Sequence, residues 1–208
     1  MIDRRYPPSR RTVLAATAGL VFAATPAAAK RRKEAQGKKT EETAREAAPT
    51  GTPLPIPRLI DLVDGETFDL VAEATTHAFL KDKPVAAIGY GGTYLGPALR
   101  LKRGTRPKVR LVNRLVRPTN LHWHGLIVAG RFDGATSPGI ARDTSWETEL
   151  AVDQPAATLW YHAHVHGHAT RDVHDGLAGL LLVEDGTAAH LGLPSTWGVD
   201  DIPLVLQD

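Results

Sequence analysis

The sequence predicts an all-β fold, a Greek-key sandwich or barrel, from three observations. Short β-like runs recur from Pro53 onward, and Gly- and Pro-containing turns separate them. Residues 145–152 alternate, with Trp, Thr, Leu and Val on one face and mainly Ser and Glu on the other, which is typical of a half-buried antiparallel strand. Helical patterns after Pro53 are short, a single turn at 188–193 being the best candidate. A chain of about 150 ordered residues can bury one adequate core.

Eight segments have the length and composition of strands. They are residues 67–76, 99–102, 108–115, 120–128, 145–152, 158–164, 177–184 and 203–206. Turns or loops are expected at 89–96, 131–139, 154–157 and 192–198, where Gly, Pro, Asp and Ser gather.

The first 52 residues are expected to lie outside this fold. In residues 1–29, Arg10 and Arg11 precede an apolar run at 13–24 and a small-residue stretch at 27–29, so the segment resembles a twin-arginine signal peptide. A general secretory signal or a retained anchor is the alternative. The apolar run is too short to span a bilayer permanently, so export to the periplasm or cell exterior is expected, with no transmembrane span after signal removal. Residues 30–52 contain almost no large apolar side chain and predict a disordered charged linker.

Charge and cysteine content exclude several classes of function. The sequence pI is near 9.0, but residues 47–208 hold 14 basic and 18 acidic residues, so the basic excess lies in the first 46. The folded part is mildly acidic and has no nucleic-acid footprint. Because the chain has no cysteine, disulfides, iron–sulfur clusters, cysteine nucleophiles and thiolate-ligated copper are excluded.

Two His-x-His pairs point to a metal site. His122 and His124 flank a tryptophan, and His162 and His164 follow another tryptophan by two and four residues. In a strand, residues i and i+2 project to the same side, so two such pairs can surround one site. Neutral imidazole suits copper, zinc, iron and nickel. One pair alone could equally be a solvated face or hydrogen-bonded core residues, whereas both together favour a metal.

Several motifs give the chain a family resemblance. Gly-Pro-Ala-Leu at 96–99, Leu-His-Trp-His-Gly-Leu at 121–126, Asp-Gln-Pro-Ala-Ala-Thr at 153–158, Trp-Tyr-His-Ala-His-Val-His-Gly at 160–167 and Gly-Leu-Ala-Gly-Leu at 176–180 occur in order. Together they resemble the first cupredoxin domain of a multicopper oxidase, in the laccase-like branch of copper-efflux and bilirubin oxidases. The resemblance implies a plastocyanin-like (cupredoxin) domain at 53–200 and the start of a second, truncated domain at 201–208.

The resemblance also implies residue roles. His122 would bind the type 2 copper, and His124, His162 and His164 would bind the type 3 coppers of a trinuclear cluster. Asp133 matches a carboxylate that assists proton delivery to dioxygen in the family, although an Asp-Gly turn explains it equally well from the sequence. His166, His168 and His174 are expected to be bystanders.

Three functional interpretations follow. The first is an oxidase domain that supplies half of the cluster ligands, the whole enzyme oxidising a phenol, a bilirubin-like compound or cuprous ion and reducing O2 to water. The family's type 1 copper cysteine and remaining ligands lie in C-terminal cupredoxin domains, so we expect the chain to be a fragment that needs them. The second is a non-catalytic copper carrier or interaction module; structural cell-division members of the superfamily have lost the histidines. The third is a zinc or iron site of cupin or hydrolase type, with a carboxylate from Asp133, Asp172 or Asp175.

Overall fold

A computed structural model describes residues 53–207. The predicted signal peptide at 1–29 and the predicted linker at 30–52 lie outside the described residues. Leu54–Asp208 forms a compact unit of its own. Within the described part of the chain, no helix has the length and apolar content needed to cross a membrane.

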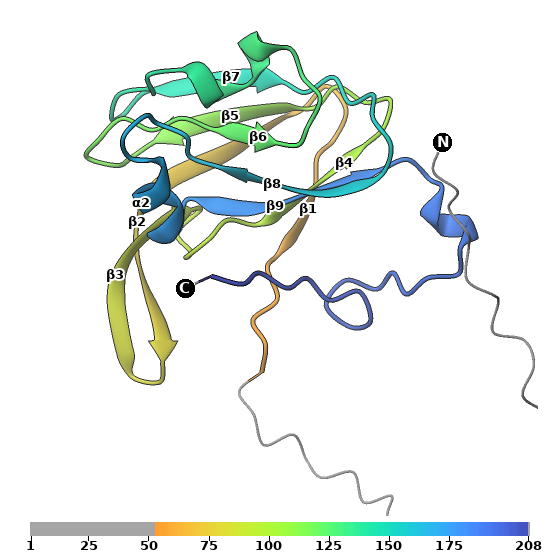
Figure 1. Cartoon of the computed structure of the whole chain (residues 1–208), viewed down its shortest axis with the longest axis horizontal. Helices are drawn as coiled ribbons and strands as arrows, with labels where there is room; N and C mark the ends of the chain where they lie inside the picture. The colour runs from red at the N-terminus through yellow and green to blue at the C-terminus, as the bar shows by residue number, and fades with distance from the viewer. Residues whose placement is uncertain (1–52, 208) are drawn as a thin grey trace, which may run out of the picture. The chain divides into compact units, whose positions relative to one another are not determined.

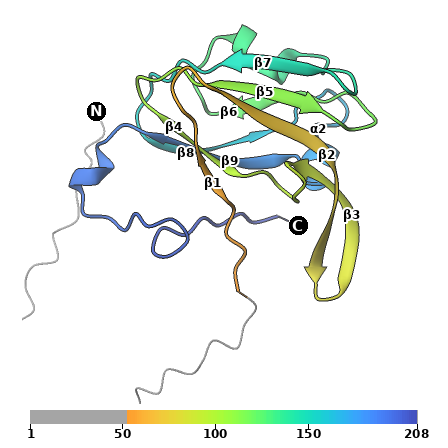
Figure 2. The same cartoon turned by 180° about the vertical axis from the view of Figure 1, so that it is seen from behind.

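In residues 53–207, nine strands form two sheets that face each other, which confirms the predicted β-sandwich (Figure 1, Figure 2). The five-stranded sheet has the order β1 (Leu59–Asp61), β4 (Ala98–Lys102), β9 (Ala178–Glu184), β8 (Ala157–His162), β6 (His122–His124). The four-stranded sheet has the order β3 (Lys83–Tyr90), β2 (Thr67–Leu80), β5 (Lys108–Asn113), β7 (Ser145–Glu149). Parallel pairs such as β2 with β5 and β4 with β9 show that the chain crosses between strands that are not consecutive.

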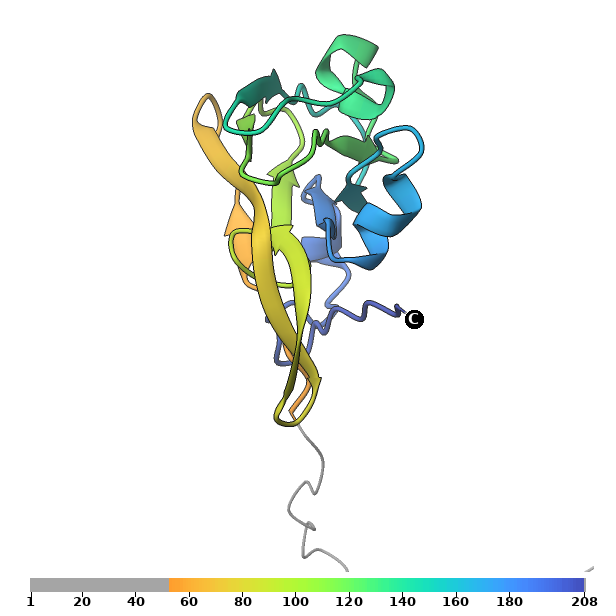
Figure 3. The ribbon, with the colours of Figure 1, turned by 90° about the vertical axis from the view of Figure 1, so that its left-hand side faces the viewer.

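The helices are short and lie in the connections. They are α2 (Ala169–His174) and the 3-10 turns η1 (Gly130–Phe132), η2 (Gly134–Thr136) and η3 (Ala188–His190). The turn η3 lies where a single turn was expected, and η1 and η2 lie in the predicted loop at 131–139. The helix α2 was not predicted, because it directly follows the histidine-rich stretch and has only six residues. Figure 3 shows α2 packed against one end of the sandwich, with the β2–β3 hairpin extending past it.

The core lies between the two sheets and follows the strand alternation. In β5 every second residue is fully buried, namely Val109, Leu111 and Asn113. In the segment 145–152 the predicted inward face is also confirmed, since Thr148, Leu150 and Val152 are buried. Its ladder ends at Glu149, so the strand is shorter than the alternating pattern. Burying this apolar face is the main force that holds the sheets together.

Two strands were missed and one predicted strand is absent. The strand β3 contains Pro84 and Gly89 and begins with four exposed residues, so its composition predicts no strand; it is an edge strand that pairs only with β2. Proline is tolerated at such an edge, where one side of the strand has no ladder to complete. The three-residue β1 is too short to detect by pattern. The apolar run at 203–206 forms no strand, because it pairs with no other strand in the described residues.

Tyr161 explains two of the glycine-containing motifs. Its side chain is fully buried, and its hydroxyl donates to the Pro97 carbonyl at 2.7 Å. A Cβ atom on Gly179 would lie 2.3 Å from the Tyr161 ring, and one on Gly96 would lie 2.2 Å from its hydroxyl. Only glycine therefore fits at these two positions. The space that the two glycines leave for the Tyr161 ring fixes the position of β8 at the residue before His162.

Candidate metal centre

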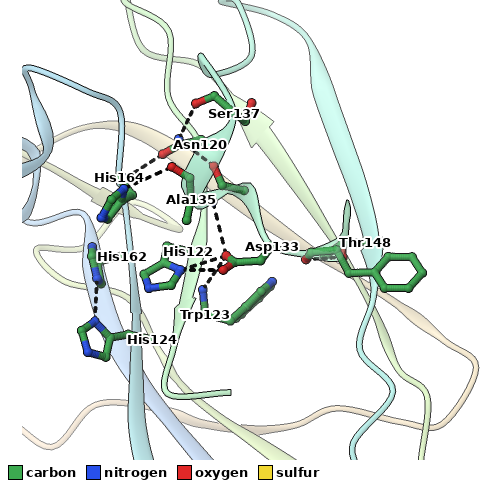
Figure 4. Close-up of polar contacts among 12 residues, drawn as sticks. Asn120, His122, Trp123, His124, Asp133, Ala135, Ser137, Thr148, His162 and His164 are labelled. Atoms are coloured by element: carbon green, nitrogen blue, oxygen red, sulfur yellow. Dashed lines mark hydrogen bonds and ion pairs between the residues drawn. The ribbon is translucent and has the colours of Figure 1, made fainter. Parts of the chain in front are cut away.

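The two histidine pairs meet where β6 runs antiparallel to β8. In this ladder His122 lies opposite His162, and His124 lies opposite Trp160. Within residues 53–207, β6 is the outer strand of its sheet, so the site lies at a sheet edge. Figure 4 shows the four imidazole rings gathered at this edge, with Asp133 beside His122. The ring centroid of His122 lies 5.4 Å from the ring centroid of His124, 5.2 Å from that of His162 and 5.1 Å from that of His164.

Three of the four predicted ligands already form a metal-sized cluster. One nitrogen from each of His122, His124 and His162 lies within 4.8 Å of the others. His164 lies beside this group, its ring centroid 5.7 Å from that of His162, but it is not one of the three. No carboxylate belongs to the group among the described residues, so the donor set is purely imidazole.

His164 departs from the sequence prediction in one respect. We expected a strand over 158–164 that would carry both His162 and His164, but β8 ends at His162. The reason is the partner strand: β9 begins at Ala178, opposite His162, and only one further backbone bond follows, from the Ala163 N–H to the Leu177 carbonyl. His164 is therefore exposed and outside the ladder.

Neighbouring groups determine which ring nitrogen of each histidine faces the cluster. Nδ1 of His122 lies 2.9 Å from both oxygens of Asp133, and Nδ1 of His162 lies 2.9 Å from the Ala163 carbonyl. Nδ1 of His164 lies 3.2 Å from the Ala135 carbonyl. Because a carbonyl or carboxylate oxygen accepts, these three Nδ1 atoms are assigned the proton, which leaves each Nε2 free to bind a metal. For His124 the arrangement is reversed, since its Nδ1 faces Nε2 of His162 at 3.3 Å.

Burial keeps His162 in its metal-binding form. It is 6% exposed, and the pKa of His162 is lowered from 6.5 to about 4, mainly by burial. The bond to the Ala163 carbonyl opposes this shift, and the other three histidines add to it. A neutral imidazole at neutral pH does not have to lose a proton before it binds a metal.

The two tryptophans have different positions. Trp123 is fully buried in the core, on the face of β6 opposite to His122 and His124, and Ala163 is also buried. Trp160 is only partly buried and lies on the histidine face. Its ring stacks on His162 at a centroid distance of 3.9 Å and lies 4.9 Å from His124. Trp123 therefore supports the site from the core, and Trp160 covers it.

Asp133 is both a turn residue and a neighbour of the cluster. It ends η1 and caps η2, accepting from the Ala135 N–H at 3.3 Å. The same carboxylate accepts from the Trp123 N–H at 3.3 Å and from Nδ1 of His122. The turn interpretation and the site interpretation are thus compatible. Its role in proton delivery stays a prediction.

The other predicted candidates lie apart from the cluster. His166, His168 and His174 are exposed and do not belong to the imidazole group. Asp172 is buried and paired with Arg117, and Asp175 lies near Arg171 at 3.3 Å. The carboxylate ligand that a cupin-type or hydrolase-type zinc or iron site needs is therefore not among the grouped residues.

Two buried amides that sequence reasoning missed hold the loops of the site. Gln154, 6% exposed, accepts from the Ile127 N–H at 2.7 Å and donates to the Gly125 carbonyl at 3.4 Å. Asn120, 2% exposed, accepts from the His164 N–H at 2.6 Å. For Gln154 the only available signal was its place inside the family-like motif at 153–158, whereas Asn120 lies just before the motif at 121–126 and gave no signal.

Comparison with known proteins gives consistent results. The family model described as multicopper oxidase matches residues 72–188. The chain is 38% identical over 143 residues to "Multicopper oxidase mco" of Staphylococcus haemolyticus, covering 69% of this chain and 32% of that protein. It is 39% identical over 155 residues to "Cell division protein FtsP" of Edwardsiella tarda, covering 74% and 33%. The chain thus spans about a third of the length of these relatives.

Solved structures support the same assignment. The laccase-like multicopper oxidase CueO from Ochrobactrum sp. superposes with a TM-score of 0.66 at 38% identity, over 69% of this chain and 32% of that one. A laccase from Pediococcus acidilactici superposes with a TM-score of 0.66 at 34% identity, over 74% and 35%. The sandwich is therefore cupredoxin-like, and its imidazole cluster is compatible with the copper that this family binds. The chain belongs to the multicopper oxidase family.

Proposed function

We propose that this chain contributes four imidazoles, those of His122, His124, His162 and His164, to a trinuclear copper cluster. The observation that supports this best is the convergence of one ring nitrogen from each of three histidines within 4.8 Å, with no acidic group in the cluster among the described residues. In the assignment implied by the family, His122 binds the type 2 copper and the other three bind the type 3 coppers. Copper held by these histidines together with the remaining cluster ligands would supply the four-electron reduction of O2 to water, with the electrons taken from the reducing substrate.

The chain's own residues prepare the site for that metal. Asp133, the Ala163 carbonyl and the Ala135 carbonyl hold the protonated nitrogens of three rings, so their Nε2 atoms need no reorientation on binding. Trp160 excludes water from one face of His162. Asp133 can also hold or move a proton at Nδ1 of His122. We propose that this contact is the basis of its role in proton delivery.

The complete activity requires more than this domain. The chain spans about a third of the length of its relatives. We therefore propose that C-terminal cupredoxin domains, on a longer product or a separate chain, supply the remaining ligands and the type 1 copper. The reducing substrate in this proposal is a phenol, a bilirubin-like compound or cuprous ion. We also propose export to the periplasm or cell exterior, through the twin-arginine signal predicted at residues 1–29.

A second candidate, a non-catalytic copper carrier or interaction module, is favoured by one observation. The similarity to proteins named cell division protein FtsP is as high as that to proteins named multicopper oxidase. A purely structural module has no need of four clustered imidazoles. Copper uptake by the chain separates a copper-binding role from an interaction role, and activity after addition of the missing domains separates an oxidase from a carrier.

The test compares matched double variants of the full chain. We expect bound copper, measured by elemental analysis after dialysis, to be lost in His122→Ala/His164→Ala and retained in His166→Ala/His168→Ala, whose histidines are exposed and outside the cluster. Oxidation of a phenolic or cuprous substrate should arise only when the proposed C-terminal cupredoxin domains are fused to the chain or mixed with it. Equal copper content in the two double variants would reject the proposed ligand set. Copper binding without any gain of oxidase activity would favour the carrier.

A further inference from the structure

Asn120 lies two residues before His122 and is almost completely buried, with 2% of its surface exposed. All polar atoms of its side chain are used. Oδ1 accepts from the His164 N–H at 2.6 Å, and Nδ2 donates to the carbonyls of Gly134 and Ser137, both at 2.9 Å. Figure 4 shows the carboxamide between the segment of His164 and the turn that follows Asp133.

The segments that Asn120 joins all carry groups of the copper site. Its own backbone leads into β6 and His122. The η2 turn carries the Ala135 carbonyl, which accepts from Nδ1 of His164, and begins next to Asp133, which accepts from Nδ1 of His122. Gly134 also donates its N–H to the Leu121 carbonyl at 2.9 Å, so the turn packs directly against the start of β6.

His164 depends on this side chain because the sheet no longer holds it. The last backbone bond between the end of β8 and the β9 region runs from the Ala163 N–H to the Leu177 carbonyl. The next N–H, that of His164, bonds to Asn120 instead of to a strand. A side-chain amide thus replaces a ladder bond at the one ligand that lies beyond the strand end.

We propose that Asn120 is a positioning residue that fixes His164 and the η2 turn relative to His122, and so sets the orientation of the fourth imidazole. The inference rests on the proposed copper site. By holding the His164 backbone and the η2 turn at once, Asn120 keeps Nδ1 of His164 on the Ala135 carbonyl of that turn and leaves Nε2 free for a metal.

A buried amide with three hydrogen bonds stabilises a fold wherever it lies. The test therefore needs a control residue that is equally buried and makes the same number of hydrogen bonds. Asn113 provides it. This residue is fully buried, donates from Nδ2 to the Arg117 and Ile140 carbonyls at 2.9 Å, and accepts from the Leu115 N–H at 2.9 Å. None of its partners belongs to a segment that carries a histidine ligand.

The experiment compares Asn120→Ala with Asn113→Ala in the full chain. Both variants should lower the urea midpoint by similar amounts, because each removes three side-chain hydrogen bonds and leaves two backbone groups without a partner. Only Asn120→Ala should convert His164 from the Nδ1–H tautomer to a mixture, read by ¹⁵N NMR of the metal-free chain at alkaline pH. Only Asn120→Ala should weaken Cu(II) binding, by about 10- to 100-fold, the range for loss of groups that orient ligands.

Retention of the His164 tautomer and of copper affinity in Asn120→Ala would overturn the inference, as would equal changes in Asn113→Ala. If Asn120→Ala does not fold, Asn120→Ser replaces it. The neutral hydroxyl adds no charge to this buried position and can donate only one hydrogen bond, so it cannot serve both the Gly134 and the Ser137 carbonyl, and the same changes should occur with smaller size. Wild-type behaviour in both readouts would overturn the inference. Because the tautomer is read without metal, a wild-type chain that takes up no copper would refute the copper function and not the role of Asn120.

Discussion

The two histidine pairs have the same His-x-His spacing but are held in different ways. His122 and His124 both lie on β6, so the pleat of the strand places them on one face. His162 is the last residue of β8 and is buried, whereas His164 lies beyond the strand end and is exposed. The sheet therefore holds both histidines of the first pair. In the second pair the sheet holds His162, and the side-chain amide of Asn120 holds the backbone of His164.

This difference shows that spacing in the sequence predicts which residues meet but not what holds them. Backbone ladder bonds depend on a partner strand, and for β8 that partner begins at Ala178. Beyond this point a ligand needs hydrogen bonds from side chains. Variants that weaken the sheet should therefore affect stability first, and variants that weaken the loops should affect copper binding first.

The largest effect is expected from the tryptophan that supports the first pair. Trp123→Ala removes a fully buried side chain between His122 and His124, so the free energy of unfolding should fall by about 3–5 kcal/mol. Trp160→Ala removes a partly buried ring that stacks on His162, and should cost only about 1 kcal/mol. Urea denaturation of the two variants measures both values. Equal losses would mean that the sheet does not hold the first pair more firmly than the second.

A medium effect is expected at the turn that orients His122. Asp133→Ala removes the acceptor for Nδ1 of His122, and should weaken copper binding about 10- to 100-fold. It should cost only about 1 kcal/mol of stability through loss of the η2 cap. Asp133→Asn is the matched control, since its amide oxygen can still accept from Nδ1, and should retain most of the affinity. Isothermal titration with Cu(II) distinguishes the two, and an Asp133→Ala variant that binds copper as tightly as wild type would show that the ring needs no such partner.

The sequence predicted the sandwich and the grouping of the histidines because both depend on local patterns. The alternation at 145–152 reports a half-buried face directly, and two His-x-His motifs beside tryptophans predict a cluster that the structure brings together. The edge strand β3 could not be predicted, because Pro84 and Gly89 argue against a strand and only pairing with β2 creates one. Asn120 could not be identified either, since its function depends on three contacts up to 44 residues away in the chain. Such long-range hydrogen bonds leave no periodic signal.

The smallest effect is expected at the start of β8, the end of the strand opposite to His162. Asp185, just after β9, accepts from the hydroxyl and N–H of Thr187 and from the N–H of Ala156, just before β8. These bonds lower the pKa of Asp185 to about 2 from 3.8, the Thr187 hydroxyl contributing most. Because the folded-state pKa lies below the unfolded value, the stabilisation is present above pH 3.8 and is lost as the pH falls through about 2. Asp185→Asn should therefore be slightly less stable than wild type near neutral pH, and the gap should close over that acidic window in urea denaturation series. Copper affinity should not change, because this contact lies at the start of β8 and His162 lies at its other end; a loss of affinity would show that the two ends of the strand are coupled.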